Sequence, residues 1–98
     1  MKIFLDTANV EEIKKGVEYG VIDGVTTNPS LISKENKGFL PLVEEIVSIV
    51  PGPVSVEVTA TDAEDMIEEA KKYSRISDNV VIKVPINLEG LKVVNTLT

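Results

Sequence analysis

Strand-like runs that alternate with helix-like runs constrain the fold of this chain more than any other feature of its sequence. The runs typical of strands occupy residues 2–6, 24–28, 54–59 and 80–84. Each is followed by a helical pattern, and these patterns begin at Asn9, after Asn28, at Thr61 or Asp62, and at Asn87. Alternation at this spacing predicts right-handed βαβ crossovers and therefore a parallel sheet in an α/β fold.

Capping residues and glycines mark the ends of the predicted helices. Asn9 and Glu12 have the spacing of an N-cap and its third-position partner, and Gly20 suits the end of the first helix. Gly52 and Pro53 end the second helical segment. The apolar residues at helical spacing are Val10, Ile13 and Val17; Leu40, Val43, Ile46 and Val47; Met66, Ile67, Ala70 and Tyr73; and Leu88, Leu91, Val94 and Leu97.

The length of the chain restricts how such a sheet can be completed. Its 98 residues allow one domain at most. A parallel sheet with helices on only one face would expose its other face, and parallel sheets are almost always covered on both. A (β/α)8 barrel needs about 250 residues, so this chain would supply a parallel (β/α)4 half of one, and the other half would come from a missing remainder or from another copy. The alternative architecture is a flat doubly wound sheet with two helices on each face.

The composition excludes several classes of function. The chain has no cysteine and no histidine, which excludes disulfides, zinc sites and histidine acid-base chemistry. A net charge of −6 without a basic cluster argues against a nucleic acid partner. No apolar run approaches the roughly 20 residues of a membrane span, and the acidic N-terminal segment is unlike a signal peptide. We therefore expect no membrane association and a cytoplasmic location.

Strand parity places the polar residues on one face of the predicted sheet. Successive side chains of a strand point to opposite faces, so the valines of 54–59 share one face and Ser55, Glu57 and Thr59 share the other. The same parity gives every strand a polar carboxyl end, with Asp6, Thr26 and Asn28, Glu57, and Lys83. Barrel active sites are built at this end of the strands, so we expect Asp6, Asn28, Glu57 and Lys83 to converge there.

Each of these residues also has a purely structural interpretation. Lys83, within "VVIKVP", could protect an edge strand from aggregation or extend to solvent. Asp6 could cap the following helix, and Asn28 could belong to a turn. Glu57 could be a solvated residue on an open face. Their common position on one side of four strands favours a shared functional site.

A lysine in an apolar strand points to imine chemistry. Burial disfavours its ammonium form and so favours the nucleophilic neutral amine, whereas neighbouring carboxylates have the opposite effect. A neutral Lys83 would attack a ketone to form an imine, and the imine would accept electrons as a neighbouring carbon–carbon bond breaks. Asp6 and Glu57 could transfer protons directly or through a water molecule, and Thr26 and Asn28 could orient substrate hydroxyls. The chain has no phosphate loop or dinucleotide motif, so no nucleotide cofactor is indicated.

Four segments resemble the transaldolase family, especially its short microbial branch that includes fructose-6-phosphate aldolase. They are "IFLDTAN", "DGVTTNPSLI", "GPVSVEVTA" and "NVVIKVP", and the last is followed by "EGLKVV". The pair "GVTTNPS" and "VIKVP" is highly specific, and the match extends over essentially the whole chain.

The resemblance implies a (β/α)8 barrel that works without a metal or organic cofactor. It implies that Lys83 forms the imine, that Asp6 is the acid-base group and that Glu57 positions a water molecule. It also implies substrate contacts for Thr26 and Asn28. Family members transfer a dihydroxyacetone unit between sugar phosphates in the pentose phosphate pathway, or cleave fructose 6-phosphate. A sugar phosphate is therefore the expected substrate.

One departure from the family pattern is large. Family members continue through four more strands, which supply further substrate-binding residues and the arginine that holds the substrate phosphate. The only arginine of this chain, Arg75, is predicted at a helix end away from the carboxyl ends of the strands. We therefore expect residues 1–98 to be the N-terminal half of a barrel domain, with weak or no activity alone. The alternative is a non-catalytic half-barrel that folds as a homo-oligomer through its open sheet.

Overall fold

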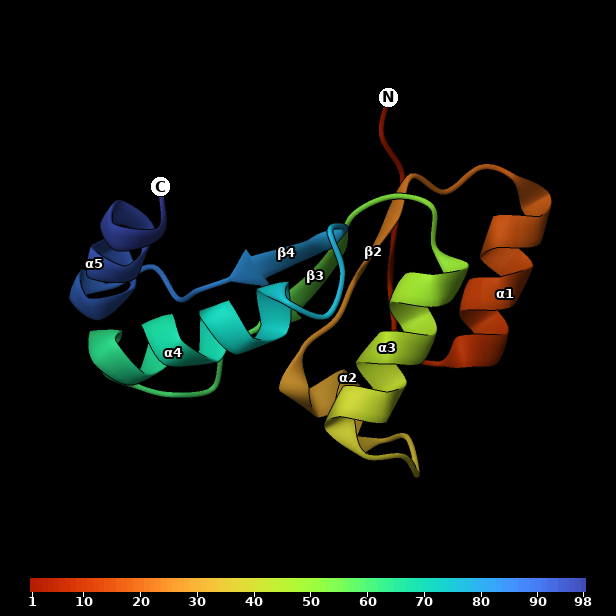
Figure 1. Ribbon diagram of the computed structural model, residues 1–98. Helices are drawn as coiled ribbons and strands as arrows, with labels where there is room; N and C mark the ends of the chain where they lie inside the picture. The colour runs from red at the N-terminus through yellow and green to blue at the C-terminus, as the bar shows by residue number, and fades with distance from the viewer.

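The sheet has four parallel strands in their order along the chain. In the computed structural model, which describes residues 1–98, they are β1 (Phe4–Asp6), β2 (Gly24–Thr26), β3 (Val54–Glu57) and β4 (Val80–Lys83). Each strand pairs with the next, so β1 and β4 form the two edges (Figure 1). This sequential order confirms the parallel α/β half-barrel. A doubly wound sheet would instead reverse its strand order.

Five helices connect or follow these strands. They are α1 (Val10–Tyr19), α2 (Pro29–Ser33), α3 (Phe39–Ile49), α4 (Ala63–Ser74) and α5 (Leu88–Leu97). The predicted caps are confirmed: Asn9 accepts a hydrogen bond from the Glu12 backbone N–H, and Gly20 adopts the left-handed conformation after α1 with φ of 73°. None of the five helices has both the length and the apolar composition needed to cross a membrane.

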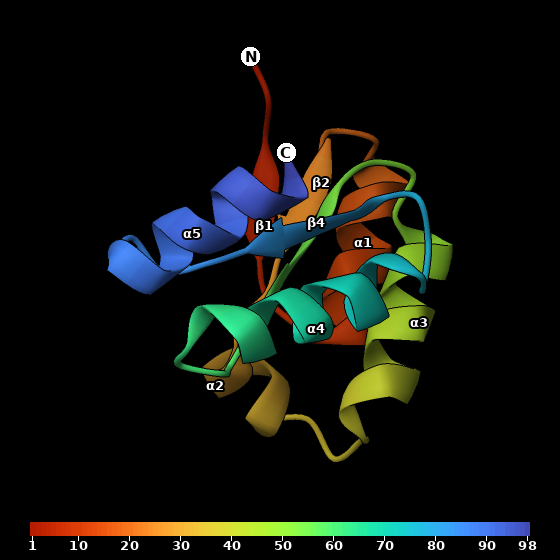
Figure 2. The ribbon, with the colours of Figure 1, turned by 60° about the vertical axis from the view of Figure 1, so that its left-hand side comes forward.

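The hydrophobic core lies between the helices and one face of the sheet. The helices α1, α3 and α4 lie on the same side of the strands (Figure 2). Sixteen buried hydrophobic residues form a single cluster there, as parity predicts. The strands contribute Val25, Val54 and Val56, and the helices contribute Ile13, Leu42, Ile46, Met66 and Val93 among others. The folding free energy gained by apolar burial therefore comes almost entirely from this face.

The opposite face of the sheet is uncovered. Its apolar side chains remain accessible to solvent, with Phe4 43% and Val81 49% exposed. Both residues have the strand parity of the predicted polar face. Their exposure indicates that no helix of the chain covers this face. This face of the sheet, which we call the open face, also carries the candidate site residues.

The apolar residues at helical spacing in α5 do not form a buried stripe; they are Leu88, Leu91, Val94 and Leu97. These side chains are between 40% and 75% exposed, whereas Gly90 and Val93 of the same helix are buried. The reason is that α4 is the helix against which α5 mainly packs. A helix with one neighbour buries a narrower strip of its surface than a helix held between two.

The connection between β3 and α4 is held by the carboxylate of Glu69. This side chain accepts hydrogen bonds from the backbone N–H groups of Thr59 and Ala60, at 2.9 Å in each case, and from both the Thr59 and the Tyr73 hydroxyls. Burial alone would raise the pKa of Glu69, but these four donors together hold it below the ordinary value. Burial and the bond to Glu69 raise the pKa of Tyr73 to about 12.

We expect Glu69→Gln to lower the free energy of unfolding by about 1–2 kcal/mol at pH 7. The glutamine amide has one acceptor oxygen where glutamate has two, so it cannot accept all four bonds. Since the folded state depresses the pKa of Glu69, its contribution is complete above the ordinary glutamate pKa and disappears as the pH falls through the folded value. Urea denaturation of both proteins between pH 7 and pH 3 measures the difference. If the difference in free energy of unfolding between the two proteins stayed constant over this pH range, it would contradict a stabilising role for the ionised Glu69.

Candidate active site

Lys83 and Glu57 form an ion pair at the carboxyl ends of adjacent strands. The two residues are register partners in the β3–β4 ladder, and Lys83 Nζ lies 3.4 Å from Glu57 Oε1. The side chains are 51% and 30% exposed respectively. Lys83 lies on the open face of the sheet, so the apolar run around it does not bury its side chain. The pair presents an amine and a carboxylate to the same approaching molecule.

Asp6 and Thr26 form a second pair on the same face. They are register partners in the β1–β2 ladder, and the Thr26 hydroxyl donates to Asp6 Oδ1 at 2.9 Å. The Thr26 hydroxyl hydrogen is used in this bond, and the other carboxylate oxygen of Asp6, Oδ2, has no side-chain partner. The contact orients the Asp6 side chain across the open face. The alternative reading of Asp6 as a helix cap is not supported, since Asn9 caps α1.

Asn28 occupies a different position from the four paired residues. Its Oδ1 accepts the Leu31 backbone N–H at 2.9 Å, which makes it the N-cap of α2. Its carbonyl oxygen therefore has a structural role, as a helix cap rather than in a turn. Capping fixes the side chain at the carboxyl end of β2, beyond Thr26 and with the same strand parity.

Ser55 lies between the two pairs and has no role predicted from the sequence. It is the register partner of Thr26 on one side and of Val81 on the other. Its Oγ is buried and has no hydrogen-bond partner, which is unusual because a buried polar group without a partner costs roughly 1–3 kcal/mol. Its strand parity with Glu57 was the only sequence signal for its position.

The ladder register joins these groups into one strip across the open face. The strip runs from Asp6 through Thr26 to Ser55 within the sheet, and Glu57 and Lys83 lie one pleat further toward the carboxyl ends. It offers a lysine side chain, two carboxylates and two hydroxyls. The chain has no group of three or more acidic side chains placed to hold a metal ion.

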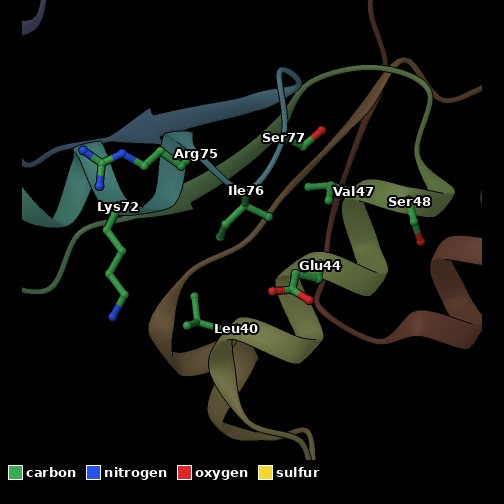
Figure 3. A pocket seen from close by; sticks show the side chains of 8 residues that line it. All are labelled: Leu40, Glu44, Val47, Ser48, Lys72, Arg75, Ile76 and Ser77. Atoms are coloured by element: carbon green, nitrogen blue, oxygen red, sulfur yellow. The ribbon is translucent and has the colours of Figure 1, made fainter.

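The largest cavity of the chain is remote from this strip. It has a volume of about 580 Å³ and lies in the outer layer, between Leu40, Glu44 and Val47 of α3 and Lys72 and Arg75 at the end of α4 (Figure 3). Because α4 runs opposite to the strands it connects, Arg75 lies near the start of β4 rather than near Lys83 at its end. The prediction that the single arginine lies away from the candidate site is confirmed.

Comparison with known proteins identifies the family to which this arrangement belongs. The family model described as transaldolase/fructose-6-phosphate aldolase matches residues 3–98. Three curated relatives, each named "probable transaldolase", match over all 98 residues. They come from Methanococcus vannielii at 60% identity and from Methanococcus maripaludis and Desulfotalea psychrophila at 58% each.

The chain spans about half the length of these relatives, since the aligned region covers 46% of each. The match includes both strand pairs of the open face and the segment "EGLKVV" after β4. The family model covers residues 3–98, and the relatives align with all 98 residues of the chain. The protein therefore belongs to the transaldolase/fructose-6-phosphate aldolase family.

Proposed function

We propose that this chain carries the imine-forming half of a transaldolase-type active site, with residues 1–98 as the N-terminal half of a (β/α)8 barrel domain. The observation that carries the proposal is the pairing of Lys83 Nζ with the Glu57 carboxylate at the carboxyl ends of β3 and β4. The Asp6–Thr26 pair on the same face supports it. Active sites of (β/α)8 barrels are built at this end of the strands.

In this proposal Lys83 is the nucleophile. Its neutral amine adds to the ketone carbon of a sugar phosphate, and loss of one water molecule gives the imine. Glu57 accepts the proton released by the amine and holds the water molecule. Asp6 removes the proton from the substrate hydroxyl beside the bond that breaks, and the bonding electrons pass into the imine. Thr26 fixes the Asp6 carboxylate, while Thr26 and Asn28 contact substrate hydroxyls.

The substrate class follows from this chemistry and from the family. The chain would transfer a dihydroxyacetone unit between sugar phosphates, as in the cytoplasmic pentose phosphate pathway, or cleave fructose 6-phosphate, with no metal or organic cofactor. Arg75 lies at the other end of the sheet, so the open face has no guanidinium for the substrate phosphate. We therefore expect imine formation with small ketones but weak turnover of sugar phosphates by these 98 residues alone.

Reductive trapping tests the proposal. The chain is incubated with dihydroxyacetone and cyanoborohydride, which reduces an imine to a stable amine, and the adduct is located by peptide mass spectrometry. We expect it on Lys83 in preference to Lys92, a surface lysine paired with Glu89. Equal labelling of both lysines, or no adduct on a chain that circular dichroism shows to be folded, would overturn the proposal.

We also propose that the open face is covered by a second copy of the chain. Two observations favour this assembly: Phe4 and Val81 are exposed on the open face, and the outer edges of β1 and β4 have no strand partner. Parallel sheets are rarely exposed on one face, and unpaired edges are templates for another chain. Homo-oligomerisation through this face could occur with or without catalysis.

The state of association in solution tests this second proposal. We expect light scattering to give a mass of at least two chains, and Val81→Glu to shift the protein toward the monomer by placing a charge in the interface. Tyr19→Glu is the matched control, since Tyr19 is 75% exposed at the end of α1 and away from the open face. A folded, monodisperse monomer of the unaltered chain would contradict self-association.

A further inference from the structure

The segment "EGLKVV" follows the lysine strand and has no place in the chemistry described above. Its first residue, Glu89, lies in the first turn of α5 and reaches to another helix. Glu89 Oε1 accepts the backbone N–H of Ala63 at 3.0 Å, and Ala63 is the first residue of α4. That N–H is one of the unsatisfied donors at a helix start, so an acceptor from α5 completes the N-terminus of α4.

Gly90 allows α5 to lie directly against the segment after Lys83. A Cβ atom at position 90 would overlap the carbonyl group of Pro85, so only glycine permits this approach. The Asn87 side chain caps the same turn by accepting the Gly90 N–H at 2.8 Å. In the sequence, only five residues separate Lys83 from Glu89, whose carboxylate contacts α4.

The segment between β3 and α4 is held from three sides. The Val58 N–H donates to the Lys83 carbonyl at 3.1 Å, Glu69 binds Thr59 and Ala60, and Glu89 binds Ala63. Two of these three contacts come from the polypeptide that carries or follows Lys83. The connections after β3 and after β4 are therefore joined to each other immediately beyond Glu57 and Lys83.

We propose that Glu89 is a positioning residue for the Lys83–Glu57 pair. By joining the β4–α5 connection to the start of α4, it fixes the carboxyl ends of β3 and β4 relative to each other. The separation of 3.4 Å between Lys83 Nζ and Glu57 Oε1 depends on this alignment. The inference rests on the proposed function, because it assigns Glu89 an effect on imine formation, although Glu89 does not contact the reacting groups.

The contact can be removed from either side. Glu89→Leu removes the acceptor, and Ala63→Pro removes the donor without an unfavourable residue, since proline is favoured at the first position of a helix. The preceding residue, Asp62, already has the extended conformation that proline requires, with φ of −104° and ψ of 154°. Glu89→Gln keeps an acceptor oxygen, and Lys92→Met removes only the neighbouring ion pair at 2.8 Å.

The first measurement is the rate of reductive trapping on Lys83 as a function of dihydroxyacetone concentration. We expect Glu89→Leu and Ala63→Pro each to lower the maximal rate roughly tenfold, with the half-saturating concentration within about twofold, as for a loss of orientation. The double variant should be no worse than either single one. Glu89→Gln and Lys92→Met should stay within about threefold of the unaltered chain. Equal losses in the Gln and Leu variants, or additive losses in the double variant, would overturn the inference.

The second measurement is amide hydrogen exchange at Val58, which needs no activity. Val58 bonds to the Lys83 carbonyl, so we expect its exchange to become about tenfold faster in Glu89→Leu and in Ala63→Pro but not in Glu89→Gln. Unchanged exchange in both former variants would overturn the positioning role even if no chain gives an adduct. Failure of the unaltered chain to form an adduct, with the exchange differences present, would count against the proposed function alone.

Discussion

Lys83→Met is expected to abolish reductive trapping of dihydroxyacetone while leaving the chain folded. The amine of Lys83 is the only lysine nitrogen paired with a carboxylate on the open face, and methionine cannot form an imine. The expected change is a complete loss of the adduct. Peptide mass spectrometry of the trapped protein measures it, with Lys92→Met as the matched control that retains the adduct.

The same substitution should have little effect on stability. The pair is solvent-accessible, with side chains 51% and 30% exposed, and exposed ion pairs typically contribute less than about 1 kcal/mol. Urea denaturation should therefore give a free energy of unfolding within about 1 kcal/mol of the unaltered chain. An adduct that persists in Lys83→Met, on any lysine at the original level, would remove Lys83 from the proposed chemistry.

Gly52→Ala is expected to cause the largest loss of stability among single-methyl additions. A Cβ atom at Gly52 would overlap the backbone carbonyl of Asp23. That carbonyl cannot easily move, because Asp23 is fixed by two bonds of 2.7 Å to Ile3, one through its backbone N–H and one through its carboxylate. Asn79 also donates to the Gly52 carbonyl at 3.0 Å. We expect the free energy of unfolding to fall by about 3 kcal/mol or more.

Gly38→Ala is the matched control for this change. A Cβ atom there would approach only the Pro41 ring at 3.5 Å, which is ordinary contact, and Gly38 has φ of −63°. The gain from a less flexible unfolded chain and the small loss at a helix N-cap should nearly cancel, leaving a change within about 1 kcal/mol. Comparable denaturation midpoints for the two alanine variants would show that the backbone around Asp23 yields to the added methyl group.

Local signals in the sequence were sufficient to predict the elements and the faces of this fold. Asn9 and Gly20 act through neighbours in the chain, and the valines of β3 are buried as parity requires. Parity likewise predicted that Asp6, Thr26, Glu57 and Lys83 share one face. The register of the strands, which the sequence did not show, pairs Asp6 with Thr26 and Glu57 with Lys83. These inferences needed only distances of a few residues and the geometry of a pleated sheet.

Features that depend on what covers a surface could not be predicted in the same way. Lys83 and the stripe that includes Leu91 have interior-type sequences, yet both are exposed because no residue of this chain packs over them. No pattern in the sequence singles out the carboxylates of Glu69, in the acidic run "IEEAKK", or of Glu89, in the mostly apolar helix α5. Their hydrogen bonds to Thr59 and Ala63 arise only from tertiary placement of a helix beside a loop.

The one-sided core has a consequence for how this half-barrel tolerates substitution. Residues that stabilise the fold and residues that face an incoming molecule occupy opposite sides of the same strands, with Val54 and Val56 on one side and Ser55 and Glu57 on the other. Effects on folding and on binding should therefore be nearly additive between the two sides. A library that varies only odd-numbered positions of β3 would redesign recognition without repacking the interior.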